Sequence, residues 1–519
     1  IVKIAITSSV VLLCSGFALY SFFRLSAAEG QKDFNLYELV PSTTSAVFVT
    51  DDVLEFVAEV DELTCSKNQQ YLYVSKLFSY LKQSLYALSE DTPHGLSRQM
   101  NQMLISFHEP DNERNQVLYC RLGNGDKELV NRFVRKYISS LYPPKTFIYK
   151  GEEIIIYPMA DGDFLACYLT SDFMALSFQK KLIENVIDAY KSGKSLADDS
   201  TFTGIRAPKK SAAAATIYTR MQGMMGWTEF DMKMKDDFIY FSGITHDADT
   251  CFAFINQLRQ QQSVKGFPGE VLPSTAFYFS RQGITDWVSL LSYGNAQGQS
   301  VPARTSEVQN RDKEFSRYLM ENAGQDLVAC LFQREDTLQD AAAVLSLSVA
   351  DVTEAERMLR ALVNAAPADE GRRNPRITFC YTVNKAYPIY RLPQTTLFEQ
   401  LTSFAEPTLD VYAAFYGGRL LLAPDADALA HYIRQLDKGE VLNGAMAYQT
   451  GMDHLSDCYH FMLMADFDHI FQQSENHVRF VPDFFLRNAD FFRHFTFFVQ
   501  FACADGVVYP NIVLKYKSE

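Results

Sequence analysis

The densest group of side chains able to bind a metal ion lies near the carboxyl end of the sequence. His454, Cys458 and His460 carry nitrogen and sulfur donors of the kind that zinc prefers, at a spacing that a turn could fold together. However, residues 460–467 alternate in polarity like a β-strand, which would point neighbouring side chains to opposite faces. These three residues are therefore weak metal candidates, and we expect no metal site in the protein.

The segment Lys191–Ser195 resembles the end of a phosphate-binding loop. That motif needs a glycine five residues before Gly193 and runs from a strand into a helix. Here the earlier position is Asp188, inside a predicted helix, and Gly193 is better explained as the residue at which that helix stops. No GxSxG, HExxH or EF-hand spacing occurs in the sequence. We therefore expect no catalytic residues, no cofactor and no enzymatic activity.

Phenylalanine is concentrated between residues 480 and 501. Packing in a core explains most of these rings. One sheet face cannot readily bury all of them, so some could form an apolar surface for a partner. Our candidates for partner binding are Phe484, Phe485, Phe491 and Phe492.

The elements that must position these residues are written twice along the chain. Pro41–Thr43 and Pro273–Thr275 open two β-like stretches that lie 232 positions apart. Thr146–Tyr149 recurs as Thr378–Tyr381 at the same offset, and an apolar helical stripe precedes each tetrad.

A second and longer match has an offset of 246 positions. It begins in each copy with a helix whose apolar residues share one face, and each helix stops at a glycine, Gly193 or Gly439. The match continues through Leu196 and Leu442 into a strand. The matched helical residues are Ile183, Val186, Ile187 and Tyr190 in the first copy and Leu429, Tyr432, Ile433 and Leu436 in the second.

These repeats predict two related domains, at 41–268 and 269–519. Each copy interleaves antiparallel strands with helices, which indicates the α+β class. The predicted fold is therefore two tandem α+β domains with antiparallel sheets and packed helices, preceded by one N-terminal transmembrane helix. The period is too long for a solenoid.

Ile4–Phe23 is a run of 20 residues without a charge, which at the helical rise spans roughly 30 Å, the thickness of the hydrocarbon core of a bilayer. A cleaved signal peptide with Ser26–Ala28 as its cleavage site, and a lipoprotein signal around Cys14, are the alternatives. The run is too long for the first, and Leu13 is too large for the second. We expect an uncleaved single-pass anchor in the inner membrane, a linker over 24–40, a cytoplasmic N-terminus and a periplasmic body.

Composition excludes several classes of function. The net charge of −14 and the absence of a basic stripe argue against a nucleic-acid partner. The 47% of hydrophobic and 21% of charged residues are typical of a globular protein and not of a disordered one. The cysteines are scattered without CxxC pairs, so we interpret most of them as core residues. An exported body could also form one or two disulfides.

The repeat resembles a family of uncharacterised envelope proteins. The similarity lies in the Pro-Ser-Thr entry to each copy, in the helix ends Lys191–Leu196 and Asp437–Leu442, and in the aromatic residue that follows, Phe202 or Tyr448. The family consists of single-pass proteins of Gram-negative anaerobes with an exported domain of unknown function. The resemblance implies a location and an architecture but no site residues, and the second copy departs from the pattern at Asp437–Lys438.

The resulting hypothesis is a membrane-anchored periplasmic protein-interaction module, acting as an accessory subunit or as an assembly or export factor of an envelope complex. Its expected partners are other envelope or inner-membrane proteins, together with the lipid bilayer through Ile4–Phe23. The alternative is an enzyme, or a lipid- or small-ligand-binding protein, with a pocket between the two repeats.

Overall fold

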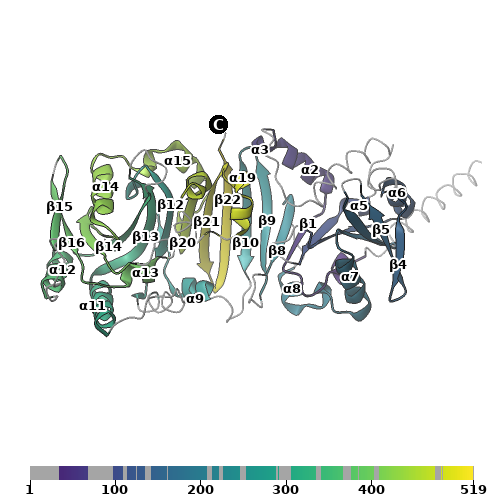
Figure 1. Ribbon diagram of the computed structural model, residues 1–519, viewed down its shortest axis with the longest axis horizontal. Helices are drawn as coiled ribbons and strands as arrows, with labels where there is room; N and C mark the ends of the chain where they lie inside the picture. Colours follow the sequence, from purple (N-terminus) through teal and green to yellow (C-terminus); the bar gives the residue numbers. More distant parts are fainter. Residues whose placement is uncertain are drawn as a thin grey trace, which may run out of the picture. The chain divides into compact units, whose positions relative to one another are not determined.

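Figure 1 shows a computed structural model of the protein. The predicted anchor Ile4–Phe23 lies outside the residues that the structure describes. Among the described residues, no helix is both long enough and apolar enough to cross a membrane. The described residues are 34–67, 98–108, 114–123, 126–134, 142–159, 162–206, 213–220, 226–245, 253–287, 290, 306–334, 341–365, 376–383, 385–402, 408–473, 481 and 483–517.

The chain divides into two compact units. Unit 1 comprises Ile1–Thr43, Ser84–Ile105 and Arg114–Asp199, and unit 2 comprises Thr44–Gln83, Ser106–Glu113 and Ser200–Glu519. These units are cut at other positions than the predicted repeats, so the division at residues 268 and 269 stays a prediction.

The elements of unit 1 are the 3-10 helices η1 (Leu36–Leu39) and η3 (Leu196–Asp198), the helices α5 (Arg98–Asn101), α6 (Asp126–Phe133) and α7 (Lys180–Ser192), and the strands β2 (Met103–Phe107, which ends in unit 2), β3 (Gln116–Arg121), β4 (Lys145–Tyr149), β5 (Glu152–Pro158), β6 (Phe164–Leu169) and β7 (Phe173–Ser177). These strands pair in the order β4–β5–β6–β7–β3–β2. Buried side chains of α7 pack on this sheet, and Gly193 ends that helix with a left-handed φ of 63°.

The strands of unit 2 are β1 (Ala46–Thr50), β8 (Ala215–Thr219), β9 (Thr228–Lys235), β10 (Phe238–Thr245), β11 (Val264–Lys265), β12 (Ala276–Gly283), β13 (Ala323–Gln333), β14 (Ala341–Val349), β15 (Ile377–Tyr381), β16 (Ala386–Arg391), β17 (Tyr412–Tyr416), β18 (Arg419–Ala423), β19 (Cys458–Tyr459), β20 (Phe461–Asp466), β21 (Phe495–Ala504) and β22 (Val507–Tyr516). The long sheet runs β1–β8–β9–β10–β22–β21–β20–β12–β13–β14–β18–β17–β16–β15, and β11 pairs with β19 separately.

The helices of unit 2 lie on both faces of this sheet (Figure 1). One core contains side chains from α11, α12 and α13, and a second core on the opposite face contains side chains from α14 and α15. The helices are α2 (Val53–Glu62), α3 (Thr64–Lys67), α8 (Ser200–Ile205), α9 (Ala253–Gln260), η4 (Pro268–Glu270), α11 (Ser306–Asn322), α12 (Val352–Ala365), α13 (Leu397–Leu401), α14 (Ala426–Asp437), η5 (Leu442–Gly444), α15 (Met446–Met452), α16 (Phe467–Phe471), α18 (Asp483–Arg487) and α19 (Ala489–Phe492).

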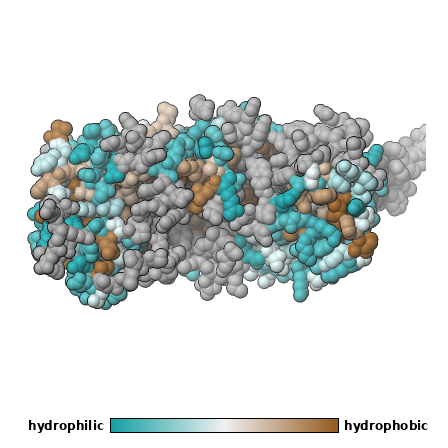
Figure 2. All heavy atoms as spheres, in the orientation of Figure 1, coloured by the Kyte–Doolittle hydropathy of each residue, from teal (hydrophilic) through white to brown (hydrophobic). Residues whose placement is uncertain are grey.

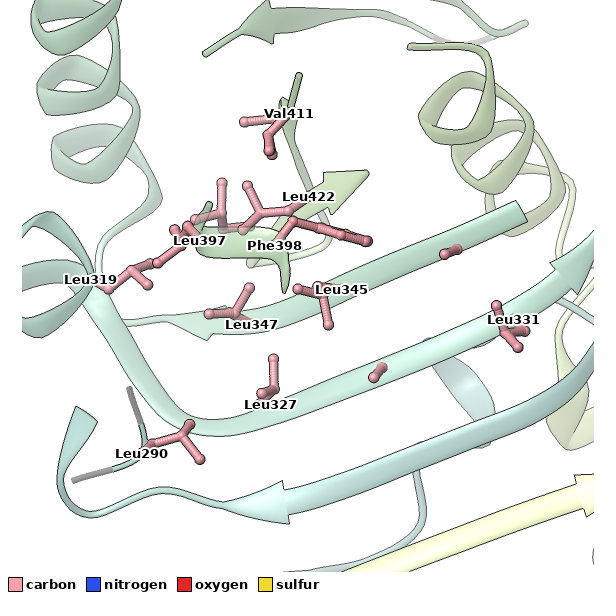
Figure 3. Close-up of a cluster of buried hydrophobic side chains, with 14 of the residues drawn as sticks. Leu290, Leu319, Leu327, Leu331, Leu345, Leu347, Leu397, Phe398, Val411 and Leu422 are labelled. Carbon is pink, nitrogen blue, oxygen red and sulfur yellow. The ribbon is translucent and has the colours of Figure 1, made fainter. Parts of the chain in front are cut away.

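Alternation along single strands builds the two cores. Leu327 and Leu331 of β13 lie in the first core, whereas Val328 and Cys330 of the same strand lie in the second. Figure 3 shows the first core, where leucines of β13 and β14 meet Leu319 of α11 and Phe398 of α13. Because both faces of these strands are buried, they read in the sequence as continuous apolar runs.

The predicted α+β class is wrong. The strands join into a 20-stranded antiparallel sheet, and helices are few among the described residues. The periodicity of the sequence identified individual strands, but it gave no information about which distant strands pair. Ser242 of β10 and Asn511 of β22, for example, pair across 269 residues.

Part of the predicted linker 24–40 is folded. Leu36–Leu39 forms η1, and the side chains of Leu39 and Val40 are fully buried. The Leu196 amide donates a hydrogen bond of 2.8 Å to the Val40 carbonyl. The body of the protein therefore begins earlier than the sequence predicts.

The two halves of the chain pair their strands in the same order. The series β4–β5–β6–β7–β3–β2 is matched by β15–β16–β17–β18–β14–β13, and β1–β8–β9–β10 is matched by β12–β20–β21–β22. Isolated bridges also correspond, since Pro41 pairs with Ser195 and Pro273 pairs with Val441. Within unit 2, the two matching series meet where β10 pairs with β22 (Figure 1).

The β10–β22 seam joins equivalent positions of the two halves. The hairpins β9–β10 and β21–β22 both turn at an aspartate with positive φ, Asp236 at 50° and Asp505 at 51°. Ser242 and Asn511 lie at the same distance beyond these turns, and they pair directly, with the Ser242 hydroxyl donating to Asn511 Oδ1 over 3.0 Å. This is the arrangement of an isologous interface, in which one surface meets its own copy.

Candidate functional site

The strongest candidate site is the outer edge of β15. Among the described strands, β15 pairs only with β16. The Arg391 amide donates to the Arg376 carbonyl over 2.8 Å, and the Thr382 amide donates to the Lys385 carbonyl over 3.0 Å. Because hydrogen-bonded pairs alternate along an antiparallel ladder, the N–H and C=O groups of Ile377, Phe379 and Tyr381 point away from β16.

The side chains of these three residues are exposed on one face of the strand. Ile377, Phe379 and Tyr381 are 37%, 54% and 70% exposed, and the two aromatic rings lie 6.3 Å apart. Cys380 points the other way and is fully buried, with its thiol 3.6 Å from the Ala430 carbonyl of α14. Figure 2 shows hydrophobic side chains at the surface of this end of unit 2.

Contacts with α12 hold this edge of the sheet in place. Tyr390 of β16 is buried, donates to Glu356 over 2.6 Å and accepts from Arg360 over 2.6 Å. Burial, followed by the hydrogen bond to Glu356, raises the pKa of Tyr390 to about 12. The Arg376 guanidinium donates to the carbonyls of Val363 and Asn364 at the end of α12. The edge is therefore a fixed feature of the fold.

The corresponding edge strand of unit 1, β4, is exposed, but its aromatic residues and the turn that follows contact charged groups of α7. Tyr149 donates to Asp188 over 3.1 Å, Lys150 forms an ion pair with the same carboxylate at 2.6 Å, and Lys180 lies 5.0 Å from the centre of the Phe147 ring. The hydrogen bond from Lys150, followed by that from Tyr149, outweighs desolvation and lowers the pKa of Asp188.

The repeated tetrads occupy corresponding strands but differ in register by one residue. Phe147 pairs with the buried Ile154, whereas it is Thr378 that pairs with the corresponding buried residue, Ile389. The outward backbone positions of β4 are therefore Thr146 and Ile148, followed by Lys150 in the turn. Those of β15 are Ile377, Phe379 and Tyr381.

Unit 2 also contains an ionic network that links β12, β13, β14 and β18. Asp326 accepts from Arg281 over 3.0 Å and from Arg419 over 3.3 Å, and Arg419 also donates to the Ser346 carbonyl over 2.9 Å. Burial alone would raise the pKa of the Asp326 carboxyl, but Arg419, a hydrogen bond from Ser348 and Arg281 outweigh it and lower this pKa. The network also includes the Gly266 carbonyl, to which Arg281 donates over 2.8 Å, so its groups bond one another and the backbone, which is typical of a structural network.

The predicted metal candidates are not brought together. His454 packs against the rings of Phe238 and Tyr240, at 4.4 Å and 5.2 Å, whereas His460 accepts from the Cys503 amide over 3.2 Å. Burial lowers the pKa of His460, and Cys458 is exposed. Within the described ranges, no three His, Cys, Asp or Glu side chains gather as metal ligands would.

Most of the predicted partner-binding phenylalanines belong to the first core of unit 2. Phe492 is buried, and Phe485 and Phe491 are partly buried against it. The Phe485 and Phe492 rings lie 5.0 Å and 5.7 Å from the ring of Phe467. The side chain of Phe484 lies outside what the structure describes. These rings mainly fill the core, so we base no docking surface on them.

Lys191, in the segment that resembles a phosphate-binding loop, has protein partners. Its ammonium group donates to the Lys150 carbonyl over 2.6 Å and forms an ion pair with Glu152 at 2.8 Å. Gly193 caps α7, as the sequence indicates.

No family model, curated protein or solved structure matches the chain. The resemblance to uncharacterised envelope proteins therefore stays a prediction.

Sequence reasoning missed the β15 edge, although the signal was present. Residues 377–381 alternate large and small side chains and carry no charge. Edge strands are commonly protected by lysine or by inward-pointing charges. An uncharged strand that has only one hydrogen-bonded neighbour is therefore a candidate for pairing with another chain.

Proposed function

We propose that the protein is a non-enzymatic interaction module whose β15 edge receives an extended segment of another polypeptide. The observation that carries this proposal is the coincidence of outward backbone groups and exposed side chains at Ile377, Phe379 and Tyr381. In strand addition, main-chain hydrogen bonds supply affinity and alternate side chains supply specificity.

The chemistry of the edge defines the segment that fits it. The strand contains no charged residue, so the incoming segment gains most when it is also uncharged there. Bulky side chains at alternate positions would cover Ile377, Phe379 and Tyr381 and remove their apolar surface from water.

The proposed setting is the envelope of a Gram-negative cell. We propose that Ile4–Phe23 anchors the chain in the inner membrane and that the folded body lies in the periplasm. Attachment to a membrane would raise the effective concentration of the edge near other envelope proteins.

Photo-crosslinking in the native cell tests the proposal. We expect Tyr381→benzoylphenylalanine to form a crosslink with a polypeptide, because this side chain lies at the open edge. Tyr509→benzoylphenylalanine is the matched control, since Tyr509 is an exposed tyrosine on β22, a strand with hydrogen-bonded neighbours on both sides.

Adding Phe379→Asp should abolish the crosslink from position 381, because a carboxylate at the edge would have to be desolvated on pairing. Thermal unfolding of each variant verifies that the fold is intact. Equal crosslinking from positions 381 and 509, or a crosslink that survives Phe379→Asp, would refute the proposed site.

A further inference from the structure

We infer that the segment received at the β15 edge is β15 of a second copy of this chain, so that the protein forms a two-fold dimer by antiparallel strand pairing. This inference rests on the proposed function and names the occupant of the same site.

The backbone of β15 is complementary to itself. The outward groups belong to Ile377, Phe379 and Tyr381, which are symmetric about Phe379. In an antiparallel pair centred there, Phe379 lies opposite Phe379 of the partner subunit, and Ile377 lies opposite Tyr381 of the partner subunit. All of these are hydrogen-bonded positions, so the pairing forms about six main-chain hydrogen bonds.

The side chains are complementary in the same register. The three exposed residues on one face meet the same three residues of the second copy, which gives a central aromatic pair flanked by two Ile–Tyr pairs. Directly opposed aromatic and β-branched side chains are favourable cross-strand pairs. On the other face Thr378 meets Cys380 of the partner subunit, and neither side chain is large enough to obstruct the approach.

Charge does not oppose this pairing. Residues 377–381 are uncharged. Arg376, the nearest cation on the amino side, is turned away, because its guanidinium donates to the carbonyls of Val363 and Asn364. In the proposed register Arg376 lies opposite Thr382 of the partner subunit, so two like charges do not face each other.

The fold already contains an interface of this kind. In the β10–β22 seam, equivalent strands of the two halves pair antiparallel about Ser242 and Asn511. The proposed β15 pairing repeats this isologous geometry between chains.

The difference between β15 and β4 limits the assembly to a dimer. On β4 the position equivalent to Tyr381 is Lys150, which is held in an ion pair with Asp188. A lysine at an edge opposes strand addition, because pairing would have to desolvate it. If β15 is the one pairing edge, as among the described strands, the assembly closes as a dimer, whereas two such edges would allow chains to grow.

Disulfide trapping of the full chain tests the register. In a Cys458→Ser background, which removes the exposed cysteine found among the described residues, we expect Phe379→Cys to form an intermolecular disulfide in most chains. Cα atoms of a hydrogen-bonded pair lie about 5.5 Å apart, which suits a disulfide. Ile148→Cys is the matched control, because Ile148 is the equivalent outward residue of β4 and is 72% exposed.

Sedimentation velocity of the purified full chain gives the second measurement. We expect the mass of a dimer, and half that mass for Phe379→Asp. A wild-type chain that is monomeric at all concentrations, or equal trapping of Phe379→Cys and Ile148→Cys, would overturn the inference. If the chain is monomeric while position 381 crosslinks to a different protein, the proposed function stands and the dimer does not. If neither occurs, both fail.

Discussion

The two halves of the chain pair their strands in the same order but place different chemistry at equivalent positions. The hairpins β6–β7 and β17–β18 correspond, since Ala166 pairs with Ser177 and Tyr412 pairs with Ala423. The first residue of the second strand is Phe173 in one hairpin and Arg419 in the other. Phe173 packs against the rings of Phe34, Tyr168 and Tyr190, at centroid distances of 4.8 Å, 5.3 Å and 5.5 Å. An aromatic cluster therefore occupies in unit 1 the position that the ionic network occupies in unit 2.

The edge strands of the two units also differ in the chemistry of their side chains. In unit 1 Lys150 and Lys180 lie beside the edge strand β4, which exposes Phe147 and Ile148, whereas in unit 2 the edge strand β15 exposes Phe379 and Tyr381. A shared backbone plan thus leaves side chains free to specialise. Equivalent interior positions thus carry an aromatic ring in unit 1 and an ionic network in unit 2, although both cores of unit 2 are mainly apolar.

The largest effect on stability is expected from a substitution in the ionic network of unit 2. Asp326→Ala removes the carboxylate that Arg281 and Arg419 share, leaving two largely buried cations beside each other. We expect a loss of about 3–5 kcal/mol in the free energy of unfolding, measured by denaturant titration. Phe173→Ala in unit 1 is the comparison, with a loss of about 3 kcal/mol from lost packing.

The dependence of these two stability losses on salt concentration distinguishes the loss of the ionic network from the loss of apolar packing. The Asp326→Ala loss should shrink slightly as ionic strength rises, because salt screens the repulsion between these largely buried arginines only in part, whereas the Phe173→Ala loss should not change. If both losses respond alike to salt, the ionic network does not differ in kind from the aromatic cluster.

A smaller effect is expected from pH at another pair of equivalent positions. The equivalent residues are Asp466, the last residue of β20, and Arg220, the residue after β8 in the first half. The Arg220 guanidinium lies 5.1 Å from the centre of the Trp227 ring. Asp466 instead bonds Lys517 at 2.7 Å and forms an ion pair with His469 at 3.3 Å. The hydrogen bond to Asp466 outweighs desolvation and raises the pKa of His469.

Because the folded pKa of His469 is raised, its contribution to stability is complete below the unfolded value of about 6.5 and is lost as pH rises through the folded value. We expect unfolding midpoints to fall over that window in the wild-type chain and to lose this slope in His469→Gln. A slope that is unchanged in His469→Gln would assign the pH dependence to other groups.

The smallest effect on folding is expected from replacing Lys150 beside the β4 edge. The same change should have a direct effect on assembly. Ile148→Phe combined with Lys150→Tyr gives the β4 edge two of the three outward residues of β15, with Thr146 retained at the position of Ile377. We expect unchanged thermal unfolding, because both positions are exposed, and assemblies larger than the parent in sedimentation velocity. Lys150→Ser with Ile148 retained is the control. Unchanged assembly size in the double variant would show that the edge residues do not decide pairing.

Local structure was the part of the fold that could be predicted from the sequence. The apolar stripes of α7 and α14, and the glycines that end them, stand where the 246-residue offset placed them. These features depend on neighbouring residues, so periodicity and glycine chemistry are sufficient to locate them.

Pairing between distant strands could not be predicted in this way. The tetrads at Thr146 and Thr378 match letter for letter at their first two positions, yet the backbone register of their hairpins offsets them by one residue. Between equivalent pairs the β15–β16 hairpin, from Thr378 to Ile389, is four residues longer than the β4–β5 hairpin, from Phe147 to Ile154, and this difference accompanies the change of register. For the same reason, the sequence did not show that β15 is an edge.

The candidate site was missed because the usual sequence signal of a site is a cluster of rare side chains, such as His454, Cys458 and His460. Those residues serve packing and local hydrogen bonds. The β15 edge instead consists of common residues, and its distinctive feature is that it has one hydrogen-bonded neighbour among the described strands, which only the sheet topology reveals.

The β10–β22 seam has a consequence for how the protein is made. Ser242 cannot pair with Asn511 until Asn511 has been synthesised, 269 residues later. At ribosomal speeds of roughly 5–20 residues per second, this interval is on the order of tens of seconds. Throughout it, the nascent first half carries a strand whose final neighbour does not yet exist, and protection by a chaperone would be most valuable during that time.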